Sequence, residues 1–220
     1  MYIFLAYVSL GSIAVPLLLW LSKAKYNFKI PFLRAMLVLL LVTGGLDLIA
    51  YVLSKMGMSN IPVINIFFIL QFYLLSYIYS IYLKKNIFIK VSVIVFSVLI
   101  IINALFIQPF NQMQSWSDGL QSVLLIFYGI ICHKYLLRHL SADESKDYML
   151  FWVNMAFMFY FSLNLYIFFT SNYLFNNETS DIVIIVWAFH NCFNVIKNVM
   201  LAVGIYYAGK LKIENLHKQI

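Results

Sequence analysis

The chain is short of charge. Only 10% of its 220 residues are Asp, Glu, Lys or Arg, whereas 64% are hydrophobic and the mean hydropathy is +0.90. A soluble domain of this size carries roughly 25% charged residues. The shortage excludes a water-soluble globular enzyme, a disordered chain and a nucleic-acid-binding domain, so nucleic acid is not expected as a partner.

Cysteine, histidine and acidic residues within the apolar runs are also scarce. The two cysteines, Cys132 and Cys192, lie in apolar surroundings, which excludes a disulfide scaffold. Of four histidines only His190 lies deep in an apolar run, and no H-x-x-x-H pair exists to support a three-histidine zinc site. An intramembrane aspartyl protease needs two aspartates, but only Asp47 is available. We therefore expect no enzymatic activity, no metal and no cofactor.

Seven long apolar stretches dominate what is present. A helix that crosses the hydrocarbon core needs about 20 mainly apolar residues. The runs are too long and too continuously apolar for the alternating strands of a barrel. The sequence predicts an all-α membrane protein, a bundle of seven transmembrane helices at residues 2–21, 33–53, 63–83, 87–107, 120–140, 149–169 and 182–207.

The basic residues predict an orientation. Thirteen of the fifteen Lys and Arg residues fall in the connections after the first, third and fifth spans and in the tail. Lys55 falls on the opposite side, and Lys197 lies inside the last span. The positive-inside rule then places the N-terminus outside and the C-terminus in the cytoplasm. We expect a multi-pass protein of the cytoplasmic membrane, with the lipid bilayer as its surroundings and an AT-rich bacterial gene as its source.

The chain is expected to form one seven-helix domain over residues 1–209, followed by a short basic cytoplasmic tail at 210–220. A weak internal similarity predicts parallel repeats at 1–85 and 119–210, with helix 87–107 as their connector. Asp47 in Gly-Leu-Asp-Leu aligns with Asn164 in Ser-Leu-Asn-Leu, and Asn65-Ile-Phe aligns with Asn191-Cys-Phe. Parallel three-helix repeats are a known plan among transporters.

The last span carries a polar stripe. His190, Asn191, Asn194, Lys197 and Asn198 follow i, i+1, i+4, i+7, i+8 spacing, so their side chains share one face of a helix. Such a face is expected to turn toward the bundle interior rather than toward lipid. For Lys197 we expect either a long side chain that reaches the cytoplasmic headgroups or a polar contact with Asn154, which lies at a similar depth.

Several buried polar groups lie at similar depths in the outer half of the membrane. By helix rise, Asp47 is roughly 9 Å and His190 roughly 12 Å below the outer edge. These two are expected to ionise as a pair or share a proton, to form a structural hydrogen bond worth about 1 kcal/mol, or to make no contact. Gly44 and Gly45 predict the close approach of a neighbouring helix. The predicted ligand-binding residues of a polar cavity open to the outside are Asp47, Gln71, Asn164, His190 and Asn191.

Two resemblances bear on function. The stretch Trp187-Ala-Phe-His-Asn-Cys-Phe-Asn-Val-Ile-Lys-Asn198 resembles the polar last helix of seven-helix membrane modules that accompany bacterial sensor kinases. That resemblance implies a sensory role, with the output domain supplied in trans by a signalling partner. Length, orientation and repeat are similar to the three-plus-one-plus-three SWEET-like sugar transporters. Their Pro-Gln dipeptide is missing, however, and Gln108-Pro109 occurs in a loop instead.

Three functions remain open from the sequence. The first is a receptor-like or sensory module that binds a small ligand and shifts helix packing for a partner protein. The second is a small-solute or proton-coupled transporter, in which Asp47 and His190 would titrate during alternating access. The third is a structural membrane subunit of a larger complex, whose polar groups only join helices.

Overall fold

The computed structural model describes residues 2–83, 87–138 and 144–217, and every regular element within them is a helix. Seven of the helical stretches are long and apolar enough to cross a membrane, which indicates a helical multi-pass membrane protein. In chain order the elements are α1 (Tyr2–Ser12), α2 (Ala14–Ser22), α3 (Ala24–Asn27), α4 (Pro31–Lys55), α5 (Ile61–Tyr82), α6 (Ile87–Ile102), the π-helix η1 (Asn103–Ile107), α7 (Ser115–Arg138), α8 (Glu144–Asn177) and α9 (Ser180–His217).

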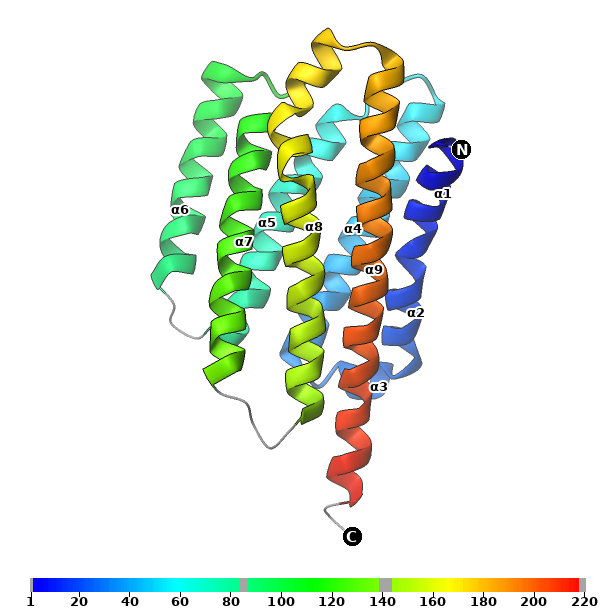
Figure 1. Ribbon diagram of the computed structural model, residues 1–220, viewed down its shortest axis with the longest axis vertical. Helices are drawn as coiled ribbons and strands as arrows, with labels where there is room; N and C mark the ends of the chain where they lie inside the picture. The colour runs from blue at the N-terminus through cyan, green and yellow to red at the C-terminus, as the bar shows by residue number, and fades with distance from the viewer. Residues whose placement is uncertain (1, 84–86, 139–143, 218–220) are drawn as a thin grey trace.

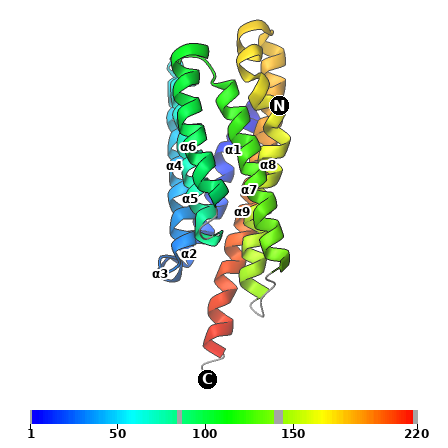
Figure 2. The same cartoon turned by 90° about the vertical axis from the view of Figure 1, so that its left-hand side faces the viewer.

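The helices form two layers. α4, α5 and α6 make one layer, and α7, α8 and α9 make the other (Figures 1 and 2). α1 and α2 close one edge by packing against α9 and α4, and α6 closes the other edge against α7. The chain begins at the upper end of Figure 1 and ends at the lower end. These are called the N-terminal end and the C-terminal end of the bundle below.

The expected first span is one membrane-crossing segment made of two helices. α1 and α2 meet at Ile13, and Pro16 lies in the first turn of α2. Proline has no N–H to donate, and its ring clashes with the carbonyl four residues earlier, here that of Ser12. The break therefore has a local cause in the sequence.

The sixth and seventh spans are longer than predicted. The segment 170–181 was expected to be a connection, but α8 continues to Asn177 and α9 starts at Ser180. Asparagine side chains bond along this last part of α8, with Asn176 Nδ2 3.0 Å from Asn172 Oδ1. At the other end, α9 runs on to His217, so the predicted tail begins as a continuation of the last helix.

The turn between α4 and α5 fixes the mouth of the site described below. Gly57 has φ +71°, a left-handed conformation that glycine adopts without strain. The N–H of Gly57 donates to the Ser54 carbonyl (3.2 Å), and the N–H of Met58 donates to that of Leu53 (2.9 Å). These two bonds form a Schellman motif, which ends α4 just after Lys55.

The helices pack closely at glycines other than those predicted. A methyl group added at Gly204 of α9 would lie 2.7 Å from Val153 Cγ2 of α8, and one added at Gly129 of α7 would lie 2.1 Å from Met158 Cγ. At Gly44 the nearest atom would be 3.6 Å away, and at Gly45 nothing lies within 4 Å. The prediction of a close approach beside Asp47 is therefore wrong. The α7–α8–α9 layer is where backbones come together.

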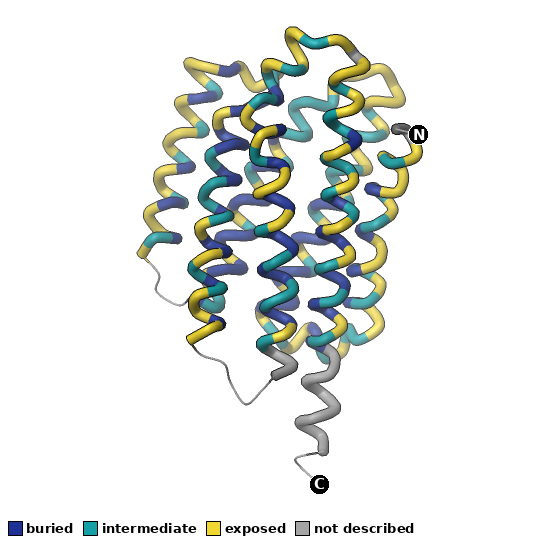
Figure 3. The backbone as a smooth tube through the Cα atoms, viewed as in Figure 1, coloured by how far each residue is buried: buried dark blue, intermediate teal, exposed yellow. Residues whose placement is uncertain are grey.

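Burial follows the two-layer plan. Dark-blue buried positions face the space between the layers, and exposed positions cover the outside (Figure 3). Large apolar side chains on that outer surface, such as Leu48 (53% exposed) and Ile94 (65%), suit contact with lipid. Near the C-terminal end, the buried Trp20 donates its indole N–H to the Leu33 carbonyl (2.7 Å), which ties α2 to the start of α4.

Candidate ligand-binding cavity

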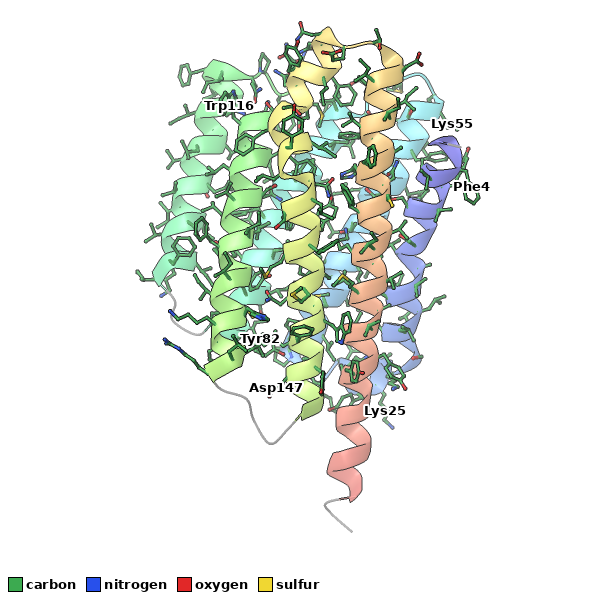
Figure 4. All side chains as sticks on the ribbon, in the orientation of Figure 1. Phe4, Lys25, Lys55, Tyr82, Trp116 and Asp147 are labelled. Atoms are coloured by element: carbon green, nitrogen blue, oxygen red, sulfur yellow. The ribbon has the colours of Figure 1, made fainter. Side chains whose placement is uncertain are left out.

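A cavity of about 390 Å³ opens at the N-terminal end, between α1, α4, the start of α5 and α9. That volume lies within the range of small-molecule sites, roughly 300–1,000 Å³. The side chains of Phe4 on α1 and Lys55 on α4 mark this end of the bundle in Figure 4. The lining combines polar and aromatic side chains, and three of the five predicted ligand-binding residues belong to it: Asp47, His190 and Asn191.

α4 contributes one stripe of the lining. Asp47, Tyr51, Ser54 and Lys55 follow i, i+4, i+7, i+8 spacing and all line the cavity, so this face of α4 turns inward. Within residues 2–83, 87–138 and 144–217, the Asp47 carboxylate has no hydrogen-bond or ion-pair partner. An ionised carboxylate can accept about four hydrogen bonds, and a partly buried one without donors is costly. Asp47 therefore presents unused acceptor capacity to the cavity.

His190 of α9 is held by α8 rather than by Asp47. The Asn164 amide N–H₂ donates to the Tyr160 carbonyl (2.8 Å), which leaves Asn164 Oδ1 as an acceptor 2.9 Å from His190 Nδ1. His190 Nδ1 must then carry a proton and donate it, because two acceptors cannot bond. In the neutral imidazole this makes Nε2 the acceptor. The expected pairing of Asp47 with His190 is replaced by a bond to Asn164.

Aromatic rings surround the imidazole of His190. Trp187, one turn earlier on α9, stacks on it with a centroid distance of 5.0 Å and an interplanar angle of 20°. Tyr160 and Phe168 of α8 meet it edge-on at 5.8 and 5.7 Å. These contacts and the bond to Asn164 fix the ring in one orientation at the wall of the cavity.

The polar stripe on α9 faces the interior, as the spacing predicts. Asn194 Nδ2 donates to Ser9 Oγ (2.8 Å), and Asn198 Nδ2 donates to Ser12 Oγ (2.7 Å). Both serines lie on α1, so the stripe binds α9 to the first helix. Asn194 also lines the cavity, whereas Asn198 lies below it.

Lys197 does not extend toward the headgroups at the C-terminal end. It is 4% exposed, and its Nζ lies 4.4 Å from the centroid of the Tyr160 ring, the same ring that touches His190. Side chains on an α-helix lean toward its N-terminus, which for α9 is the end near the cavity. The ammonium therefore lies beneath the cavity, where its field reaches Asp47 without a direct ion pair.

The remaining predicted polar residues lie elsewhere. Gln71 of α5 accepts a hydrogen bond from Gln121 Nε2 of α7 (3.2 Å) and borders a small void beside Lys197 instead of the cavity. Asn154 of α8 accepts from Tyr79 Oη (3.0 Å) and donates to the Gly129 carbonyl (3.1 Å). The sequence argument placed these residues by depth along a helix, and depth gives no direction around the helix axis.

A second buried carboxylate, Asp118, lies outside the cavity. It is 3% exposed in the first turn of α7, and its Oδ2 has no hydrogen-bond partner among the described residues. Next to it, Asn103 Nδ2 bonds to Gln114 Oε1 (2.7 Å) and Ser117 Oγ (3.1 Å), which closes the α6–α7 connection. Asp118 was easy to overlook in the sequence, because it lies at the start of a helix in a connection with no other charged residue.

Sequence reasoning missed the aromatic and hydroxyl part of the lining. Tyr7, Ser9, Tyr51 and Asn60 line the cavity beside the predicted residues. The i, i+4, i+7, i+8 spacing on α4 could have predicted that Tyr51 faces the interior, because the same kind of spacing predicted the inward face of α9. Nothing in the sequence of α1 marked Tyr7.

No group of three or more His, Cys, Asp or Glu residues that could hold a metal ion occurs in the described part of the chain. The arrangement offers instead a carboxylate, an imidazole acceptor and amide groups in an aromatic enclosure, which suits noncovalent binding. Comparison with protein families, with curated proteins and with solved structures finds no match to this chain.

Proposed function

We propose that this chain is a receptor-like sensory module of the bacterial cytoplasmic membrane, which binds a small ligand in the cavity between α1, α4, α5 and α9. The observation that carries the proposal is the unpartnered Asp47 carboxylate on the wall of a cavity of about 390 Å³. Asn194 and Asn198 of α9 donate to Ser9 and Ser12 and so join helices, whereas no described residue donates to Asp47. Asp47 also differs from the unpartnered Asp118, because Asp47 lines the cavity, where a ligand can reach it.

The distribution of charge supports an orientation with the cavity on the outside. Figure 4 shows Lys25 at the C-terminal end and Lys55 at the N-terminal end. Arg34 lies in the first turn of α4, Lys90 in the first turn of α6 and Arg138 at the end of α7, and these helix ends also lie toward the C-terminal end (Figure 1). Under the positive-inside rule, the C-terminal end is cytoplasmic. A ligand would then reach the cavity from outside the cell.

A signal could pass through α9. This helix contributes Trp187, His190, Asn191 and Asn194 to the cavity and continues to His217 at the C-terminal end. A ligand that bridges α4 and α9 favours one relative position of these helices. If the ligand binds one packing arrangement of the helices more tightly than another, it increases the population of the first. A partner protein on the cytoplasmic side would read that shift in trans.

A proton-coupled transporter is the second candidate, and Lys197 is the observation that favours it. Its ammonium lies buried beneath Asp47 on the side away from the cavity mouth. A solute and a proton could compete for Asp47 in such an arrangement. Solute flux in proteoliposomes that is abolished by Asp47→Asn would favour transport, whereas ligand binding without flux would favour the sensor.

The proposed function can be tested with a chemically mixed library of small cationic, anionic and neutral compounds. Purified protein in detergent is screened for thermal stabilisation, and each stabilising compound is retested on Ala50→Phe, which fills the cavity, and on Leu48→Phe, which changes the exposed outer face of α4. Binding that Ala50→Phe abolishes and Leu48→Phe preserves supports the proposal. A library without stabilising compounds, or stabilisation that Ala50→Phe leaves intact, contradicts it.

A further inference from the structure

Resting on the proposed function, we propose that the cavity takes a small organic cation, a ligand whose ammonium group binds Asp47 and whose apolar part lies against aromatic side chains. The free carboxylate of Asp47 and the rings that line the cavity favour a ligand with positive charge. The fixed tautomer of His190 favours a hydrogen-bond donor, and the two neighbouring lysines lie where they leave the carboxylate oxygens open.

The Asp47 carboxylate supplies the negative charge that would attract a cationic ligand. Asp47 is the acidic residue of the cavity lining, and none of the described residues donates to it or pairs with it. A carboxylate accepts hydrogen bonds and cannot donate, so its ligand must bring donors. A ligand ammonium brings up to three, and a bond between two ions is roughly twice as strong as a neutral one.

The aromatic rings suit the same ligand. Tyr51, Trp187 and Phe67 line the cavity together with Asp47. The face of an aromatic ring attracts a cation within about 6 Å of its centroid. One ring of the lining already meets an ammonium group of the protein, because Lys55 Nζ lies 5.7 Å from the centroid of Tyr51.

The neutral polar groups of the cavity wall can also accept hydrogen bonds from a ligand. With its proton on Nδ1 and directed at Asn164, the neutral imidazole of His190 has an unshared pair on Nε2. The amide oxygen of Asn191 adds an acceptor at the same level of α9. A ligand with two or three N–H groups can bond to several of these acceptors together, whereas an anionic ligand would be repelled by the Asp47 carboxylate.

The two lysines leave Asp47 available. Lys55 lies two turns along α4, about 12 Å from Asp47 by helix rise, at the exposed mouth where solvent screens it. Lys197 interacts with Asp47 electrostatically, without contact, and its ammonium lies against Tyr160 below the cavity. No ion pair within 4 Å joins either lysine to Asp47 in the described structure, so the carboxylate oxygens remain open toward the cavity.

The test compares three probes of similar size and different charge: phenethylammonium, 2-phenylethanol and 3-phenylpropionate. Their binding is measured by calorimetry on the purified chain in nanodiscs. Three proteins are used: the natural chain, Asp47→Asn, and the control Asp118→Asn, which changes a buried carboxylate outside the cavity. Thermal unfolding of each variant confirms that it is folded before binding is measured.

We expect phenethylammonium to bind more tightly than the other two probes. Asp47→Asn should weaken it by about tenfold or more, and Asp118→Asn by less than about twofold, because a hydrogen bond to a charged group is the interaction removed. If the alcohol or the carboxylate binds as well as the ammonium, or if Asp47→Asn leaves ammonium affinity unchanged, the ligand class is wrong. The same holds if phenethylammonium does not bind. In each case the mixed-library experiment, with its Ala50→Phe variant, still decides separately whether the cavity binds a ligand.

Discussion

Replacement of Gly204 by alanine tests the close packing of α9 on α8, which positions the whole polar stripe. The added methyl carbon would lie 2.7 Å from Val153 Cγ2, 3.2 Å from the Met149 carbonyl oxygen and 3.4 Å from the Val153 amide nitrogen. Favourable separations between carbon atoms are about 3.5–4.0 Å. The shortest contact is with the β-branched side chain of Val153, whose χ1 is restricted in a helix, and the Met149 carbonyl oxygen at 3.2 Å belongs to the backbone of α8, so the overlap is not easily relieved.

The expected cost follows from this geometry. Extra methyl groups in well-packed cores destabilise by about 1–3 kcal/mol. Alanine in a helix gains about 0.5–1 kcal/mol over glycine, and this part must be subtracted. Gly45→Ala measures that gain separately, because a methyl group at Gly45 meets nothing within 4 Å. We expect Gly204→Ala to be less stable than Gly45→Ala by about 1–3 kcal/mol.

Unfolding by SDS in mixed micelles, followed by tryptophan fluorescence, gives the free energies of the natural chain and both variants. The reasoning is refuted if Gly204→Ala is as stable as Gly45→Ala. That result would mean that α8 and α9 are farther apart than described here, and the placement of His190 and Lys197 would then be in doubt.

Two further predictions concern single hydrogen bonds. Asn164→Leu removes the acceptor of His190 Nδ1, and we expect a loss of about 1 kcal/mol together with a changed ¹⁵N spectrum of the imidazole; an unchanged spectrum would contradict the assigned tautomer. Trp20→Phe removes the bond to the Leu33 carbonyl, with an expected loss of about 1–3 kcal/mol in SDS unfolding. Trp116→Phe, at a 61% exposed position, is its control, and equal stabilities of the two variants would contradict that role for Trp20.

The features that the sequence predicts well are those set by local physics. A span needs only a sufficient apolar length, so seven candidate spans could be found without knowledge of their neighbours. Helix periodicity put the α9 stripe on one face, and the cost of polar groups in lipid predicted that this face turns inward; Asn194 and Asn198 bond to α1 from it. Orientation, repeat structure and function stay predictions.

The features that were missed depend on contacts between helices. Gln71 was placed at the cavity by its depth along the helix, yet it bonds to Gln121 on a neighbouring helix instead of lining the cavity. The segment around Asn176 was predicted to be a connection, but α8 continues through it to Asn177, and Asn176 Nδ2 bonds to Asn172 Oδ1 along the helix. For Lys197, the tilt of helical side chains toward the N-terminus was a stronger guide than the attraction of headgroups.

The central claim is that Asp47 faces a water-accessible cavity while its neighbour Leu48 faces the outside of the bundle. Single cysteines are introduced at each position in a background with the exposed Cys192 replaced by alanine, and both are exposed to a cationic, membrane-impermeant methanethiosulfonate reagent. We expect rapid modification of Asp47→Cys, blocked by the added Ala50→Phe, and slow modification of Leu48→Cys despite its larger exposed area. If Asp47→Cys is modified no faster than Leu48→Cys, Asp47 does not face a water-accessible cavity.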